Sequence, residues 1–240
     1  MRTIIAALTV GAALLAPAPI DAAPRAHRGE PSTTPNTSSV RALPPILVAV
    51  RVAPHIPSPI VSRLVAEAGD IWRPNGVTFV WLFEPEDGAP DRPASDGERY
   101  PASTLHVSIG DEPGSPSTEA QTPLGWIRFD GPDDPEPMIH LSYANASALL
   151  AASEGVAGRI DGMPQLEREL YLSRAMGRAL AHELGHYVLA SKAHTPHGLM
   201  QTPRSAGELF GRERVRFELD AAQKQLALER LTETLALARR

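Results

Sequence analysis

The chain has 240 residues, of which 42% are hydrophobic and 21% are charged, and its formal net charge is -5. This composition supports a packed core and excludes a wholly disordered chain. The acidic balance argues against nucleic-acid binding, which needs a basic face. Cysteine is absent, which excludes disulfides, thiol nucleophiles and cysteine-ligated metal sites. A metal ion in this protein must therefore be held by His, Asp or Glu side chains.

The first 22 residues have the composition of a secretory signal peptide. The cationic Arg2 precedes an apolar run from Ile4 to Ala16, and small residues follow around Ala22, which is the order of regions typical of such a signal. The run is shorter than the roughly 20 residues needed to cross a bilayer, so we expect no stable membrane span after cleavage. We predict an exported protein, secreted or periplasmic, and the lack of cysteine favours a bacterial source.

Residues 23–44 are rich in Pro, Ser and Thr and nearly lack bulky apolar side chains. Such a segment cannot bury enough surface to offset the entropy of the chain, so we expect a disordered tether. We expect one folded domain over residues 45–203, followed over 204–240 by a helical segment that packs on it.

The folded part opens with a pattern of strand, helix and strand. Residues 46–52 form a nearly continuous apolar, β-branched run, which predicts a buried strand. Apolar residues then recur at spacings of three and four from Ser58 up to Pro74, which predicts an amphipathic helix. Residues 77–83 form a second run, again predicted as a buried strand. The compact βαβ order indicates parallel strands.

The rest of the chain adds short strands, Pro-rich loops and a long helix. We expect Asn145 to cap the first of the later helices. The further strands and helices are predicted at residues 105–109, 126–129, 138–143, 146–153, 164–190 and 220–239. The fold class is therefore α/β (α+β), with a mixed sheet, a backing helix, a long helix and a C-terminal helix.

The chemistry is concentrated on the predicted long helix, which carries His182-Glu183-Leu184-Gly185-His186. Two histidines four positions apart lie on one face of a helix, so both imidazoles can reach one zinc ion. Glu183 lies close enough to hold the water of that metal as a general base. The spacing therefore predicts one Zn²⁺ per chain.

A catalytic zinc site needs a third protein ligand and leaves the fourth position to water. His194 is favoured because it lies eight residues after His186 and closes the shortest loop. Glu208, 22 residues after His186, and His197 stay open as alternatives.

The segment from His182 to His194, followed by Gly198-Leu199-Met200, resembles the metzincin-type zinc metallopeptidases. These proteins carry H-E-x-x-H-x-x-G-x-x-H and then a turn with a methionine beneath the metal. The resemblance covers roughly residues 45–203, implies a zincin-like catalytic domain there, and extends to small exported bacterial proteins with a similar helix. The implied roles are metal ligands for His182, His186 and His194, catalytic base for Glu183 and turn methionine for Met200.

Two positions depart from the metzincin pattern. Leu189 stands where the pattern has glycine, and His194 lies two residues further along the chain. We therefore expect the helix to continue past Leu189 and to turn near Ser191, so that His194 comes from a longer loop.

Taken together, these features predict an exported zinc metalloendopeptidase that hydrolyses peptide bonds through a zinc-bound water, with Glu183 as general base. A peptide or protein substrate would lie along an edge strand, either 126–129 or 139–143, by strand addition. We expect a monomer. The alternative is an exported zincin-like binding or structural protein without turnover, favoured if Pro-rich loops at 85–103 and 111–123 block the cleft.

Overall fold

The computed structural model describes residues 43, 45–84, 104–114, 123–202 and 204–237, all within one compact unit. The predicted signal peptide and nearly all of the predicted tether lie outside these residues. The same holds for loop 85–103 and for most of the second Pro-rich loop. The division at residue 203 stays a prediction.

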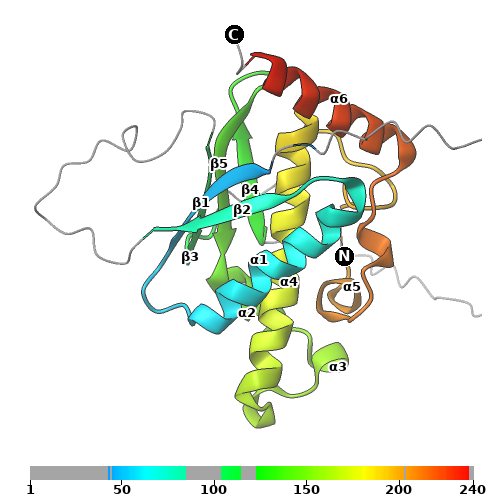
Figure 1. Ribbon diagram of the computed structural model, residues 1–240. Helices are drawn as coiled ribbons and strands as arrows, with labels where there is room; N and C mark the ends of the chain where they lie inside the picture. Colours follow the sequence, from blue (N-terminus) through cyan, green and yellow to red (C-terminus); the bar gives the residue numbers. More distant parts are fainter. Residues whose placement is uncertain (1–42, 44, 85–103, 115–122, 203, 238–240) are drawn as a thin grey trace, which may run out of the picture. The chain divides into compact units, whose positions relative to one another are not determined.

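The described strands form a mixed five-stranded sheet in the order β2-β1-β3-β5-β4 (Figure 1). β1 is parallel to β2 and β3, and β3 is parallel to β5, whereas β4 is antiparallel to β5. The strands are β1 (Ile46–Val52), β2 (Phe79–Phe83), β3 (Leu105–Gly110), β4 (Gly125–Phe129) and β5 (Pro135–Ser142). β2 and β4 are therefore the two edges of the sheet.

β4 is antiparallel because a short turn joins it to β5. The N–H of Asp130 donates to the carbonyl of Asp134 at 3.0 Å and closes this turn. The parallel pairs instead need crossover connections, and α1 supplies one of these between β1 and β2.

Some helices pack against the sheet, and further helices pack on that layer (Figure 1). They are α1 (Ser58–Trp72), α2 (Tyr143–Ala151), α3 (Glu154–Ala157), α4 (Gln165–Leu189), α5 (Ala206–Phe210) and α6 (Ala221–Leu237), with a 3₁₀ turn η3 (Val215–Phe217). α1 and α4 approach closely at Gly177, where an added Cβ would lie 2.7 Å from the Leu64 carbonyl oxygen. The indole Nε1–H of Trp72 donates to the Ala181 carbonyl at 3.0 Å and joins the same two helices.

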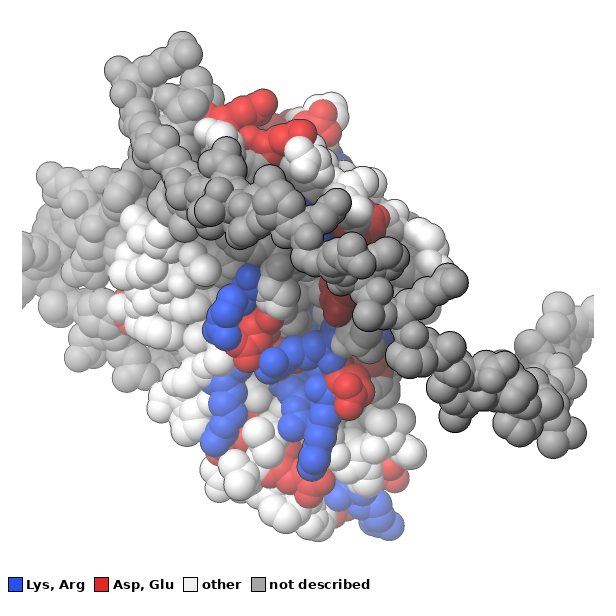
Figure 2. All heavy atoms as spheres, turned by 45° about the vertical axis from the view of Figure 1, so that its right-hand side comes forward, with Lys and Arg blue, Asp and Glu red and all other residues white. Residues whose placement is uncertain are grey.

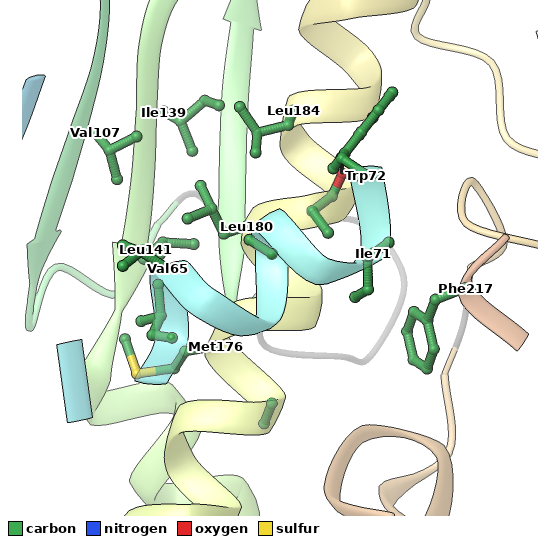
Figure 3. Packing of buried hydrophobic residues seen from close by; sticks show 14 of the residues in the cluster. Val65, Ile71, Trp72, Val107, Ile139, Leu141, Met176, Leu180, Leu184 and Phe217 are labelled. Atoms are coloured by element: carbon green, nitrogen blue, oxygen red, sulfur yellow. Dashed lines mark hydrogen bonds between the residues drawn. The ribbon is translucent and has the colours of Figure 1, made fainter. Parts of the chain in front are cut away.

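The core lies between the sheet and these helices (Figure 3). Alternate residues of β3 and β5 are buried and point at α1 and α4, as the two-residue period of a strand requires. On the long helix, the apolar residues that pack into this core recur at spacings of four. The central contacts involve Val107, Ile139, Leu141, Val65, Met176, Leu180 and Leu184.

The predicted fold class is confirmed, with a mixed sheet, the backing helix α1, the long helix α4 and the C-terminal helix α6. Three details were wrong. β2 is an edge strand and is only partly buried. Ser142, not Asn145, caps α2, because its side chain accepts the N–H of Asn145 at 3.2 Å. The stretch after Pro203, where the sequence predicts no helix before residue 220, contains α5. No described helix is long and apolar enough to cross a membrane.

Candidate metal centre

The long helix ends at Leu189, earlier than the sequence predicts. Ala190 takes a left-handed conformation with φ of 41°, a position that usually carries glycine. Its N–H donates to the Tyr187 carbonyl at 3.2 Å, and the N–H of Ser191 donates to the His186 carbonyl at 3.2 Å. The chain reverses at once, which returns the following loop to the helix face that carries the histidine pair.

This reversal brings three histidines together. The closest ring nitrogens of His182, His186 and His194 all lie within 4.8 Å of one another. Their ring centroids are 4.7 Å apart for the helical pair, and 5.3 Å and 4.9 Å from His182 and His186 to His194. His186 is buried and His194 is exposed, so the cluster runs from the protein interior to solvent.

Hydrogen bonds fix which nitrogens of the helical pair face the cluster. Nδ1 of His182 lies 2.9 Å from the Leu199 carbonyl oxygen, and Nδ1 of His186 lies 2.6 Å from the Ser191 carbonyl oxygen. Because a carbonyl only accepts, each Nδ1 carries the proton and each Nε2 presents a lone pair. This arrangement is typical of histidine ligands, whose second nitrogen donates to an outer carbonyl or carboxylate.

The two Nε2 atoms lie 3.1 Å apart. Two lone pairs that face each other at this distance repel unless a cation lies between them. Zinc–nitrogen bonds of roughly 2.0–2.1 Å in a tetrahedral site place two nitrogens about 3.3 Å apart. The donor set therefore fits zinc.

Burial keeps the helical pair neutral. Loss of solvent is the main cause that lowers the pKa of His182 to about 3, and the neighbouring His186 acts in the same direction. Burial likewise lowers the pKa of His186 to about 4, although the hydrogen bond to Ser191 acts in the opposite direction. Neutral imidazole is the form that binds a metal, so both side chains are ready ligands at neutral pH.

Glu183 lies beside this pair, and its side chain is buried under the edge strand β4. Burial raises its pKa to about 8, while a hydrogen bond from the backbone of Ile127 lowers it. An added Cβ on Gly125 would lie 3.1 Å from Cγ of Glu183 and 2.8 Å from Cδ2 of Leu141. Glycine at this position thus lets β4 close over the carboxyl group, a role that no pattern in the sequence signals.

Met200 packs against Gly185, which lies between the two helical histidines in the chain. It is 1% exposed, and an added Cβ on Gly185 would lie 2.3 Å from its Sδ. Hydrogen bonds from Thr195 N–H to the Met200 carbonyl at 2.9 Å and from Gln201 N–H to the Gly198 carbonyl at 3.2 Å close the turn that carries it.

The two alternative third ligands lie outside the cluster. Glu208 forms a capping box with Ser205 at the start of α5. Its carboxylate also lies 3.6 Å from Arg204 and 3.5 Å from Arg216. His197 is exposed, and its backbone carbonyl accepts the hydroxyl of Thr195 at 2.7 Å. Of the three candidates, the structure brings only His194 to the helical pair.

A cavity of about 800 Å³ adjoins the histidines and Glu183. β4 lines one wall, through residues such as Trp126 and Phe129, and α2 lines another through Leu149. β5 is paired on both sides, so residues 139–143 do not form an edge strand. Of the two strands considered for peptide binding, β4 is the one at an edge of the sheet and beside the cavity.

No protein-family model matches the chain, and no curated protein matches it in sequence. Among solved structures, it is similar to the crystal structure of archaemetzincin from Methanopyrus kandleri. The sequence identity is 16% and the TM-score is 0.45, and the match covers 78% of this chain and 96% of that chain.

Proposed function

We propose that this protein is a zinc-dependent metallopeptidase. The observation that carries the proposal is the pair of Nε2 atoms 3.1 Å apart, each on an imidazole whose Nδ1 is held by a backbone carbonyl. A buried carboxyl group lies one residue away, and a large cavity adjoins both. Structural histidines need none of this combination, because one hydrogen bond each would satisfy them.

His182, His186 and His194 would hold the zinc ion. A zinc ion held there would supply Lewis-acid chemistry: it would polarise a substrate carbonyl, lower the pKa of a water molecule and favour the ionised form of Glu183. The backbone carbonyls of Leu199 and Ser191 fix the orientation of the helical pair through their Nδ1–H groups.

Glu183 would act as the general base and then as the general acid. Its carboxylate takes a proton from the attacking water and delivers it to the amide nitrogen that leaves. The backbone of Ile127 donates to this carboxylate and holds it at the wall of the cavity. Because β4 supplies this donor, the strand that would bind a peptide also positions the base.

β4 is suited to bind the substrate. Its outer edge pairs with no described strand, and an extended peptide can add to such an edge by main-chain hydrogen bonds. The substrate class is therefore a peptide or protein. We further propose export, on the basis of residues 1–22, and a monomeric state.

Zinc stoichiometry and peptide hydrolysis test the proposal on the purified protein. We expect one zinc per chain, lost in His194→Ala and retained in Glu208→Ala, which is the matched control. We expect cleavage of an unfolded protein mixture, abolished in Glu183→Ala with zinc retained. Zinc binding without cleavage would indicate a binding protein. Failure of the protein to bind zinc after reloading would contradict the catalytic proposal.

A further inference from the structure

We propose that Arg204 is a positioning residue for the metal centre, which it serves by holding the Leu199 carbonyl that accepts the Nδ1–H of His182. The inference rests on the proposed zinc site. Arg204 lies outside the cluster of three histidines, and its side chain also lines the adjoining cavity. Its effect passes through one backbone carbonyl.

The Leu199 carbonyl is shared between the two side chains. His182 Nδ1 lies 2.9 Å from this oxygen, and Arg204 Nη2 lies 3.2 Å from it. A carbonyl oxygen has two lone pairs, so both donors can be accepted together. Arg204 Nη2 also donates to the Gly198 carbonyl, and Nη1 donates to the Arg216 carbonyl at 3.1 Å. One guanidinium therefore fixes two consecutive carbonyls of the turn that lies under the metal centre.

Arg204 is itself held rigidly. Its side chain is 9% exposed, and Glu208 lies 3.6 Å away. The guanidinium carbon lies 4.3 Å from the ring centroid of Phe217, and that of Arg178 lies 4.7 Å from the same ring. Phe217 also lines the cavity, and Figure 3 shows it apart from the labelled strand residues Val107, Ile139 and Leu141. A planar, forked cation suits this site, because it can stack on a ring and donate in two directions.

The C-terminal segment supports the same turn by a second route. The N–H of Leu199 donates to the Glu218 carbonyl at 2.8 Å. Gly198 has φ of +78°, and an added Cβ there would lie 2.6 Å from the Glu218 carbonyl oxygen. Arg204 and Glu218 thus contact this turn directly, and Arg216 helps to hold Arg204. All three residues lie beyond the domain boundary predicted at residue 203.

Arg214 provides a matched comparison within this segment. It pairs with Glu67 at 2.6 Å and with Asp70 at 3.1 Å, and it makes no hydrogen bond to the turn under the metal centre. On the side of the molecule where α5 lies, basic and acidic side chains are interleaved in this way (Figure 2). Arg204 and Arg214 carry the same charge, but only Arg204 contacts the carbonyl that orients His182.

Charge and position predict opposite effects of removing Arg204. Its positive charge lies close to His182, because both side chains contact the Leu199 carbonyl oxygen, and a cation there disfavours the approach of a second cation. If Arg204 acted only through its charge, its removal would strengthen zinc binding. If it positions His182, removal must weaken zinc binding, because an outer-shell partner of a ligand is lost.

The test compares R204Q, R204K and R214Q with the wild type. Zinc affinity is measured by competition with a chromophoric chelator, and thermal unfolding of the metal-free protein is recorded for each variant. We expect R204Q to bind zinc about tenfold more weakly. R204K should weaken zinc binding as well, because lysine keeps the positive charge but lacks the planar guanidinium that donates in two directions. R214Q should lower the melting temperature and leave zinc affinity unchanged.

A second readout does not depend on zinc. In the metal-free protein, NMR follows the exchange of the His182 Nδ1–H with solvent, which should be faster in R204Q and R204K than in the wild type and R214Q. Wild-type zinc affinity and unchanged exchange in R204Q would overturn the positioning role, as would tighter zinc binding. If the wild type binds no zinc, the proposed function fails, and the exchange measurement still decides whether Arg204 orients His182.

Discussion

Two buried ionisable side chains lie five positions apart on α4, and they are satisfied to very different extents. Arg178 is 1% exposed. It pairs with Glu67 at 3.0 Å and donates to the backbone carbonyls of Glu208, Leu209 and Glu213. Glu183 is 8% exposed, and the one hydrogen bond that acts on its pKa comes from the backbone of Ile127.

The difference indicates that Arg178 has a structural role, whereas Glu183 has the properties of a group that takes part in a reaction. Burial of a charge is tolerated when it is paired and hydrogen-bonded. Arg178 meets that condition because it joins α1, α4, α5 and the segment after α5. Glu183 does not, so burial raises its pKa to about 8. Groups with strongly shifted pKa values concentrate at functional sites, and Glu183 lies at the cavity wall beside three histidines.

The largest effect is expected from Glu183→Gln. We expect hydrolysis to fall by about 10²–10⁴-fold, the usual contribution of a general base, while zinc content stays the same. The free energy of unfolding should be unchanged or higher, because the variant removes a poorly satisfied buried carboxyl. Steady-state cleavage, metal analysis and urea unfolding check these three points. Full activity in this variant would place the base elsewhere.

Arg178→Met should show the opposite pattern. We expect a loss of about 3–5 kcal/mol in the free energy of unfolding, because the variant leaves Glu67 partly uncompensated inside the protein. Urea unfolding of the metal-free protein measures the loss. Arg63→Met is the control, since Arg63 forms a partly exposed pair with Glu169 at 2.9 Å, and such pairs contribute at most about 1 kcal/mol. Equal losses in the two variants would contradict the structural role of Arg178.

Two glycines extend the comparison to packing along α4. An added Cβ on Gly177 would meet the rigid Leu64 carbonyl, whereas one on Gly185 would meet the side chain of Met200. We expect Gly185→Ala to lower the free energy of unfolding by about 1–3 kcal/mol. Gly177→Ala should lower it by more. Gly185→Ala should also weaken zinc binding, because its packing partner lies under the ligand pair.

Gly69→Ala is the matched control for both variants. Gly69 lies inside α1 with open space around the position of a Cβ, so alanine should stabilise the protein by about 0.5–1 kcal/mol. Thermal unfolding with and without zinc separates the three variants. If Gly177→Ala weakens zinc binding as much as Gly185→Ala does, packing near the histidine pair has no special effect on the metal site.

The sequence predicts the parts of this site that depend on local spacing. Hydrophobic periodicity locates α1 and α4, and the four-residue spacing of His182 and His186 is a property of any helix. His194 follows from chain proximity. The structure adds that the early reversal at Ala190, rather than a longer loop, brings His194 to the pair.

The missed features depend on contacts between distant residues. Arg178 and Glu67 are 111 positions apart, and an arginine inside a helix pattern normally predicts an exposed position. Arg204 lies between the helices predicted at residues 164–190 and 220–239, and Gly125 has no distinguishing neighbour in the chain. Only the three-dimensional arrangement shows that Arg178 supports Glu67, that Arg204 supports Leu199 and that Gly125 makes room for Glu183.

The smallest effect on stability is expected at Glu208. Like Arg178, this side chain has its charge paired and hydrogen-bonded. The N–H of Ser205 is the main cause that lowers the pKa of Glu208, and the Ser205 hydroxyl, Arg204 and Arg216 act in the same direction. A lowered carboxyl pKa stabilises the fold above the usual value of 4.5, and this stability is lost as the pH falls below it. Glu208→Gln should therefore lose stability at neutral pH, and its difference from the wild type should shrink in acid.

Urea unfolding at several pH values measures that difference, and Ser205→Ala is the companion variant. It keeps the carboxylate but removes the helix cap, at a cost of about 1 kcal/mol, so its deficit should persist in acid more than that of Glu208→Gln. Zinc content should stay at one per chain in both variants, because the carboxylate of Glu208 is engaged with Ser205 and Arg204. Loss of zinc in Glu208→Gln alone would make this carboxylate a ligand and would remove it from the class of structural charges that Arg178 represents.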